Sequence, residues 1–242
     1  MGGFSQAPNQ HMIKGIIFDL DNTLVDFMAM KESAVDSAVS AMIDAGLKMD
    51  RNTAKQKIFE IYREVGIEDQ TVFDKFLTRE FGYIDSRIHA AGIVGYRRAR
   101  EATLVLYPHV YITLIELIKR GMKLAVVTDA PKLQAWLRLC QLNLHHLFDV
   151  VVTFEDTYKR KPDSAPFKIT LDKMKMRPEE AMMVGDWAER DIVGAKTLGM
   201  KTVFARYGDT FGTENSGADY EINDIIQLLE IVDNLANKDS LS

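Results

Sequence analysis

Hydrophobic and polar positions follow two different patterns along the chain. The first apolar run, Ile16–Phe18, is short and uninterrupted, which is typical of a strand buried on both faces. In the long stretch that follows, apolar residues recur at helical spacing and no segment predicts a strand. Four helices are predicted there: Phe27–Leu47, Thr53–Val65, Thr71–Phe81 and Asp85–Leu106.

From Pro108 onward, strands and helices are predicted to alternate. The predicted strands are Lys123–Val127, Asp149–Thr153, Ala181–Val184 and Lys201–Ala205. The predicted helices are His109–Arg120, Lys132–Leu142, Ser164–Met176, Glu189–Leu198 and Asn223–Ala236, the last with Asn223 as its N-cap. Strands that alternate with helices of about ten to fifteen residues indicate βαβ units and a parallel sheet. The predicted fold class is therefore α/β, a Rossmann-like core with an inserted all-helical domain.

Domain boundaries follow from the same pattern. The core is predicted at 12–26 and 107–242, and the helical domain at 27–106. Residues 1–11 are polar, Gly-rich and followed by a second methionine, so they are interpreted as an expression-tag remnant. Open parallel sheets bind ligands beyond the carboxyl ends of their strands, so a domain inserted directly after the first strand is expected to act as a lid over that edge. The alternative is that the inserted domain is a decorative subdomain with no role at the site.

Composition and charge narrow the classes of function. With 242 residues, 47% of them hydrophobic, the chain can bury a full core. A formal net charge of -5 and the lack of a long Lys/Arg block argue against nucleic-acid binding. No apolar segment approaches the ~20 residues needed to span a membrane, and no signal peptide is visible. The single cysteine, Cys140, excludes an intramolecular disulfide and a cysteine-based zinc site, which favours a cytoplasmic protein. Cys140 itself is expected to be a buried apolar residue. Nothing indicates an oligomeric state.

Two carboxylates follow the first predicted strand. Asp19 and Asp21 lie two residues apart, and side chains at that spacing in an extended chain point to the same side. Carboxylates that are close together at the end of a buried strand repel each other and lose hydration, which indicates a bound divalent cation or a perturbed pKa. The alternative is an ordinary Asp/Asn turn.

Three later strand ends also carry polar groups. Thr128 and Asp129 precede a predicted helix, where an anion is favoured, although such a pair also serves as a helix cap. Lys161 is followed by a rigid proline and is suited to hold a phosphoryl group, although a solvated basic loop fits equally well. Asp186 ends a strand and Asp191 lies just inside the next helix, where its alternative role is to complement the helix dipole. Each of these groups alone could occur by chance. A carboxylate pair, a threonine, a lysine and a second carboxylate pair at four successive strand ends are much less easily explained in that way.

With these motifs the chain strongly resembles the haloacid dehalogenase-like (HAD) hydrolase superfamily. Asp19-Leu20-Asp21-Asn22-Thr23 is similar to its first motif, Thr128 to the second, Lys161-Pro162 to the third, and Gly185-Asp186 through Asp191 to the fourth. The helical insertion resembles the C1-type cap of that family. The resemblance extends from Met12 onward.

The resemblance implies a phosphatase mechanism. Asp19 would attack phosphorus and form an aspartyl-phosphate, and Asp21 would act as general acid and then general base. Mg²⁺ would be held by Asp19, the Asp21 backbone carbonyl and Asp186, with Asp191 supporting the metal-bound water or Lys161. Thr128 and Lys161 would bind the phosphoryl oxygens.

Asp129 departs from the Asn, Ser or Gly of many relatives. It is expected to shape substrate binding beside the phosphate or to cap the next helix.

The expected function is therefore Mg²⁺-dependent hydrolysis of a small phosphorylated metabolite. A sugar-phosphate phosphotransferase or mutase is the nearest alternative, because the same aspartyl-phosphate can be passed to a sugar. Dehalogenation is disfavoured because those relatives lack the second aspartate that Asp21 supplies. A non-catalytic phosphate-binding protein is disfavoured because all the reactive side chains are present.

Overall fold

The structure is a computed structural model that describes residues 12–240, so the predicted tag remnant at 1–11 lies outside the described residues. The chain separates into two compact units. One, called the core unit, contains the described residues up to Val25 and from Leu106 onward. The other, called the helical unit, is Asp26–Val105.

The core unit is built on a six-stranded sheet with the order β3-β2-β1-β4-β5-β6. The strands are β1 (Gly15–Phe18), β2 (Lys123–Val127), β3 (Val150–Val152), β4 (Ala181–Gly185), β5 (Lys201–Ala205) and β6 (Tyr220–Ile222). Every pairing between neighbouring strands is parallel. The predicted α/β class and its parallel sheet are therefore confirmed, and β6 is a short strand that the sequence pattern did not predict.

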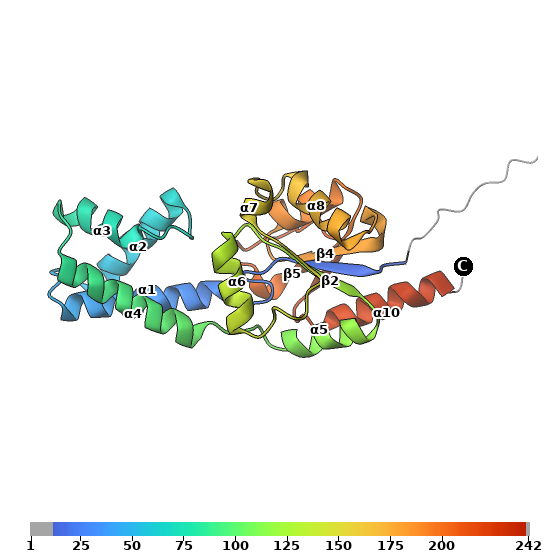
Figure 1. Ribbon diagram of the computed structural model, residues 1–242, viewed down its shortest axis with the longest axis horizontal. Helices are drawn as coiled ribbons and strands as arrows, with labels where there is room; N and C mark the ends of the chain where they lie inside the picture. The colour runs from blue at the N-terminus through green and yellow to red at the C-terminus, as the bar shows by residue number, and fades with distance from the viewer. Residues whose placement is uncertain (1–11, 241–242) are drawn as a thin grey trace, which may run out of the picture. The chain divides into compact units, whose positions relative to one another are not determined.

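Helices cover both faces of this sheet (Figure 1). They are α5 (Val110–Lys119), α6 (Lys132–Gln141), α7 (Phe154–Thr157), α8 (Ser164–Met174), α9 (Val193–Lys196) and α10 (Gln227–Ser240), with 3-10 turns η1 (Pro178–Glu180) and η3 (Arg206–Gly208). On one face, Phe167 and Leu171 of α8 pack with Ile17 of β1 and Val127 of β2 in a buried cluster. Figure 1 shows α5 and α10 on the opposite side of the strands.

Register brings the functional strand ends to one edge. Phe18, the last residue of β1, pairs with Val126 of β2 on one side and Val184 of β4 on the other. The residues after these three strands therefore emerge together at the carboxyl edge of the sheet, with β1 between the other two. This is the edge at which open parallel sheets bind ligands.

Three local expectations are wrong. The last helix begins at Gln227 rather than near Asn223, so Asn223 lies four residues before the helix and is not its N-cap. The helix predicted from Glu189 begins instead as a π turn, η2 (Ala188–Ile192), before α9. Cys140, on α6, is exposed rather than buried.

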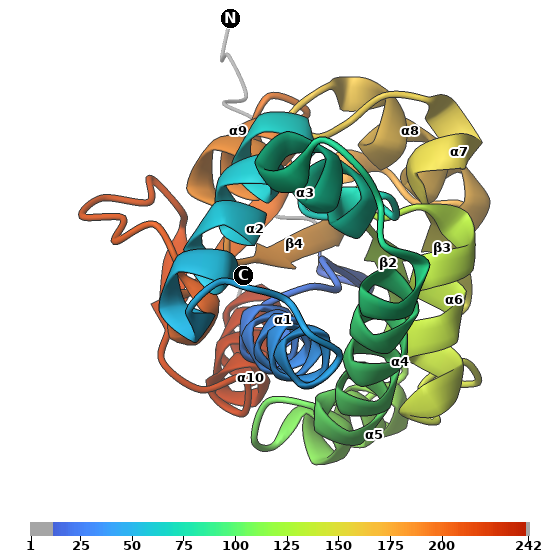
Figure 2. The same cartoon turned by 90° about the vertical axis from the view of Figure 1, so that its left-hand side faces the viewer.

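The helical unit contains α1 (Phe27–Asp44), α2 (Arg51–Val65), α3 (Val72–Phe81) and α4 (Ser86–Thr103). Its buried cluster consists mainly of apolar side chains that recur at helical spacing on α1, α2 and α3. Val39, Ile58 and Phe76 in this cluster are fully buried. α1 and α4 lie side by side (Figure 2). Among the described residues, no helix is both long and apolar enough to cross a membrane.

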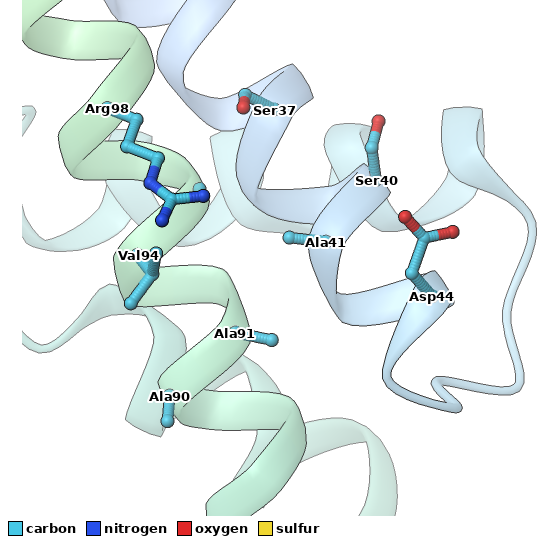
Figure 3. Close-up of a pocket in the computed structure, with 9 residues that line it drawn as sticks. Ser37, Ser40, Ala41, Asp44, Ala90, Ala91, Val94 and Arg98 are labelled. Carbon is cyan, nitrogen blue, oxygen red and sulfur yellow. The ribbon is translucent and has the colours of Figure 1, made fainter.

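Close packing of α1 against α4 depends on small residues. A Cβ added at Gly95 would lie 2.7 Å from the carbonyl oxygen of Ser37, so only glycine fits at this contact. Beside it, small side chains such as Ala41 and Ala91 leave a groove on the surface of the helical unit, with Arg98 over one part of it (Figure 3).

Candidate functional site

The loop after β1 carries the two predicted carboxylates. The backbone N–H of Asp19 donates to the Val184 carbonyl at 2.9 Å, which extends the sheet by one residue and holds Asp19 at its edge. Asn22 then turns the chain with a φ of 58°, a left-handed conformation that asparagine tolerates. Gly208 lies directly against this turn, since a Cβ there would be only 1.7 Å from the Asn22 carbonyl oxygen.

Lys161 forms the centre of the site. Its ammonium group lies 2.7 Å from Asp19 Oδ1 and 2.7 Å from Asp191 Oδ1, and it donates to the Val127 carbonyl at 3.1 Å. Only 2% of the Lys161 side chain is exposed. A buried ammonium is stabilised only when opposite charges and acceptors surround it, and these three partners supply that compensation. The solvated-loop alternative for Lys161 is therefore wrong.

Asp186 lies at the end of β4 and is also buried. Its Oδ1 accepts a hydrogen bond from the Thr23 hydroxyl at 2.9 Å, and Thr23 is itself fully buried. Burial, reinforced by the charges of Asp19 and Asp191, raises the pKa of Asp186 well above its ordinary value. Burial also raises the pKa of Asp19 to about 7, against the opposing effect of the Lys161 charge.

Asp191 approaches the strand end closely because the residue there is a glycine. A Cβ added at Gly185 would lie 2.3 Å from Asp191 Oδ2. The same oxygen accepts a hydrogen bond from the Trp187 backbone N–H at 3.1 Å, inside the π turn. Asp191 is fully buried and forms an ion pair with Lys161, so it does more than complement the helix dipole.

The carboxylates of this cluster fit a divalent cation. Asp19, Asp186 and Asp191 each offer an oxygen within 4.8 Å of the others. Lys161 compensates only one of the three negative charges, so two negative charges remain for a divalent cation to neutralise. Carboxylate oxygens are hard ligands of the kind that Mg²⁺ prefers.

Asp21 contacts a residue that the sequence did not single out. Its Oδ2 accepts a hydrogen bond from Arg138 Nη1 at 2.8 Å. Arg138 belongs to α6 and its side chain is 8% exposed, while that of Asp21 is 20% exposed. The two carboxylates of the motif therefore have different partners, Arg138 for Asp21 and Lys161 for Asp19.

Thr128 and Asp129 follow β2. Thr128 is buried, and its hydroxyl oxygen accepts a hydrogen bond from the Ala130 N–H at 3.1 Å. Asp129 does not cap α6, where Pro131 is the cap residue, so the capping alternative is wrong. Instead Asp129 accepts 3.0 Å hydrogen bonds from the Lys161 backbone N–H through Oδ1 and from Arg190 through Oδ2. These contacts fix the loop that carries Lys161.

Sequence reasoning assigned no role to four residues that contact the site. Thr23 belongs to the first motif and could have been found there, because its hydroxyl is a natural partner for a carboxylate. Arg138 and Arg190 contact aspartates that are 117 and 61 residues away, and no local pattern reports such pairs. Tyr207 donates its hydroxyl proton to the Thr23 carbonyl at 2.8 Å, again from a distant segment.

Comparison with known proteins identifies similar chains. A family model described as haloacid dehalogenase-like hydrolase matches residues 16–205. The glyceraldehyde 3-phosphate phosphatase of Methanocaldococcus jannaschii is 40% identical over 227 residues, covering 93% of this chain and 99% of that protein. The protein of the same name from Pyrococcus furiosus is 35% identical over 224 residues, covering 91% and 93%. A solved HAD phosphatase from Thermococcus onnurineus is 26% identical with a TM-score of 0.65, covering 91% of this chain and 98% of that one.

Proposed function

The chain belongs to the haloacid dehalogenase-like hydrolase family as an enzyme of the phosphatase type, and we propose that it hydrolyses the phosphate monoester of a small metabolite with the help of Mg²⁺. The family predicted from the four strand-end motifs is thereby confirmed. The observation that carries the proposal is the buried cluster in which Lys161 joins Asp19 and Asp191 beside Asp186.

In the first step, a carboxylate oxygen of Asp19 attacks phosphorus and the bond between phosphorus and the ester oxygen breaks. The product is an aspartyl-phosphate on Asp19, and Asp21 gives its proton to the departing alkoxide. Both the nucleophile and the ester are anionic, so their approach requires positive charge. Lys161, fixed by its contacts with Asp19 and Asp191, is placed to supply part of that charge.

In the second step, water attacks the aspartyl-phosphate. Asp21, now a carboxylate, accepts a proton from that water, and the bond between phosphorus and the Asp19 oxygen breaks to give inorganic phosphate and free Asp19. The Thr128 hydroxyl and the Lys161 ammonium group hold the phosphoryl oxygens through both steps. We assign Asp129 to support of this phosphate site, since it fixes the Lys161 backbone.

Asp19, Asp186 and the Asp21 backbone carbonyl would hold the Mg²⁺ ion. When bound, this ion neutralises phosphoryl charge and stabilises the developing negative charge of the transition state. Thr23 orients Asp186 through its hydrogen bond. Asp191 acts on the site through Lys161, with which it forms an ion pair.

The names of two relatives support a proposal for the substrate class. Two archaeal proteins that match nearly all of this chain carry the name glyceraldehyde 3-phosphate phosphatase, so we propose a short-chain phosphate ester as substrate and glyceraldehyde 3-phosphate as the first to test. We further propose that the helical unit, Asp26–Val105, is a C1-type cap that selects among substrates.

A phosphate-release assay on three-carbon, sugar and nucleotide phosphates tests this function. We expect release that requires Mg²⁺, is abolished by EDTA, and falls about a thousandfold or more in kcat/KM for Asp19→Asn. Asp172→Asn, at an exposed position on α8, is the matched control and should leave the activity unchanged. Undiminished hydrolysis by Asp19→Asn would contradict the nucleophile, and transfer of the phosphoryl group to a sugar instead of water would indicate a phosphotransferase.

A further inference from the structure

Arg138 is a buried cation that the reaction as described does not use. It lies on α6 with its side chain 8% exposed, and its Nη1 donates to Asp21 Oδ2 at 2.8 Å. Lys132, the other cation of the same helix, is exposed and pairs with Asp156 at 3.3 Å. The two therefore provide a natural comparison between a buried charge at the site and an exposed one outside it.

Burying a guanidinium group is costly, and the cost is offset only if a partner of opposite charge is held in good geometry. Asp21 is a partner of this kind, and it is also the side chain to which the acid and base steps are assigned. A general acid must hold its carboxyl group within hydrogen-bonding reach of the leaving oxygen. The loop that carries Asp21 leaves the sheet after Asp19, so the sheet does not hold the Asp21 side chain in place. The contact from α6 supplies that constraint.

We propose that Arg138 is a positioning residue for proton transfer, which holds the Asp21 carboxyl group through Oδ2 and so fixes where the proton is delivered. The inference rests on the proposed function. A protonated carboxyl group keeps an oxygen that accepts hydrogen bonds, so the contact to Oδ2 is compatible with both the acid and the base form of Asp21. In this role Arg138 affects the reaction through its contact with Asp21.

A positioning role has a consequence that depends on the leaving group. An alkoxide leaves poorly without a proton, so hydrolysis of an alkyl phosphate depends on a well-placed acid. A p-nitrophenolate is stable as an anion and leaves with little help. Loss of Arg138 should therefore slow the alkyl ester much more than the aryl ester, whereas general damage to the fold would slow both alike.

The test compares kcat/KM, which reports the steps through formation of the aspartyl-phosphate, for an alkyl phosphate and for p-nitrophenyl phosphate. Arg138→Met should reduce the value for the alkyl ester about ten- to a hundredfold and that for the aryl ester less than about threefold. Arg138→Lys, which keeps a cationic donor, should recover much of the loss. Lys132→Met should leave the ratio of the two values unchanged. Thermal melts verify that each variant is folded, and Arg138→Gln replaces Arg138→Met if the latter is not.

A double-variant cycle with Asp21→Asn makes the dependence on Asp21 explicit. If Arg138 acts through Asp21, adding Arg138→Met to Asp21→Asn should change the alkyl-to-aryl ratio no further. Equal losses on both esters, or a full additional loss in the Asp21→Asn background, would overturn the inference. If Asp21→Asn itself leaves the ratio unchanged, the proposed acid role of Asp21 fails instead, so the two failures are distinguishable.

Discussion

Lys161 shows at the scale of one residue how the site is held together. Its ammonium group joins the loop after β1, through Asp19, to the π turn after β4, through Asp191. Its backbone N–H is bound by Asp129 from the loop after β2. Three segments that are distant in sequence are therefore connected through one side chain and its own peptide group.

Removing this cation leaves Asp19 and Asp191 buried without the charge that compensates them. We expect Lys161→Met to reduce the free energy of unfolding by about 3–5 kcal/mol and to reduce kcat/KM by about a hundredfold or more. Urea unfolding in EDTA and a phosphate-release assay measure the two effects. Lys159→Met, at an exposed position in the same loop, should shift stability by no more than about 0.5 kcal/mol. Equal effects of the two substitutions would contradict the central role of Lys161.

The carboxylates also predict how pH and Mg²⁺ act together. Burial raises the pKa of Asp19 to about 7 and that of Asp186 well above its ordinary value. The folded state therefore holds protons that the unfolded state releases near pH 4, so the metal-free protein should lose stability as pH rises through about 4 to 7. Mg²⁺ binds the deprotonated carboxylates, and the stabilisation it gives should grow as pH rises through the same range.

Thermal melts at several pH values, each with EDTA and with Mg²⁺, measure this linkage. The increase in Tm caused by Mg²⁺ should be small at the acidic end and larger above pH 7. Asp186→Asn should weaken the increase at every pH, and Asp172→Asn should not. An increase in Tm that is independent of pH would contradict the proposed ligands.

The sequence predicted the residue types at the strand ends because each belongs to a short local motif. Asp19, Thr128 and Asp186 each directly follow an apolar run, and parallel strands bring such positions to one edge; Lys161 lies further along the chain, in the segment between β3 and α8. The pairs of Asp21 with Arg138 and of Asp129 with Arg190 were not predictable in this way. They depend on how α6 and the π turn pack on the core, and no short pattern encodes that.

At the scale of elements, the unit formed by β4, the π turn and α9 shapes the site. β4 delivers Asp186, and the π turn brings Asp191 back toward the end of the strand. Sequence periodicity predicted a regular helix from Glu189, because the apolar spacing of one π turn differs little from that of an α-helical turn. The additional backbone residue of a π turn often marks a functional site, and here it includes the residue that pairs with Lys161.

Gly185→Ala tests this unit. The new Cβ would lie 2.3 Å from Asp191 Oδ2, so Asp191 must move and its 2.7 Å contact with Lys161 is lost. We expect a loss of about 1–3 kcal/mol in stability and a fall of up to about a hundredfold in kcat/KM. Val193→Ile, which adds a methylene to an exposed side chain on α9, is the control and should change neither. Wild-type activity in Gly185→Ala would show that the position of Asp191 does not matter.

At the scale of the whole molecule, the charged cluster belongs to the core unit. Asp19, Lys161, Asp186 and Asp191 lie outside Asp26–Val105. The helical unit has its own buried cluster of apolar side chains. The chain enters and leaves that unit at neighbouring points, since Val25 and Leu106 form an antiparallel bridge. The reactive groups and the insertion are thus separable in the chain.

This separation predicts the result of removing the helical unit. An antiparallel bridge can be closed by a two-residue hairpin turn, so replacing Asp26–Val105 with Asn-Gly should leave the sheet and its edge intact. We expect the shortened protein to keep Mg²⁺-dependent hydrolysis of p-nitrophenyl phosphate, because Asp19, Lys161 and Asp186 all remain. Its kcat/KM values across a panel of phosphate esters should become nearly equal, because the unit that we assign to substrate selection is gone. The fold of the shortened protein is checked by circular dichroism. As a control, Asp19→Asn in the shortened protein should abolish the residual activity. A folded core that no longer responds to Mg²⁺, or one that keeps the full preference for a single ester, would contradict this division of labour.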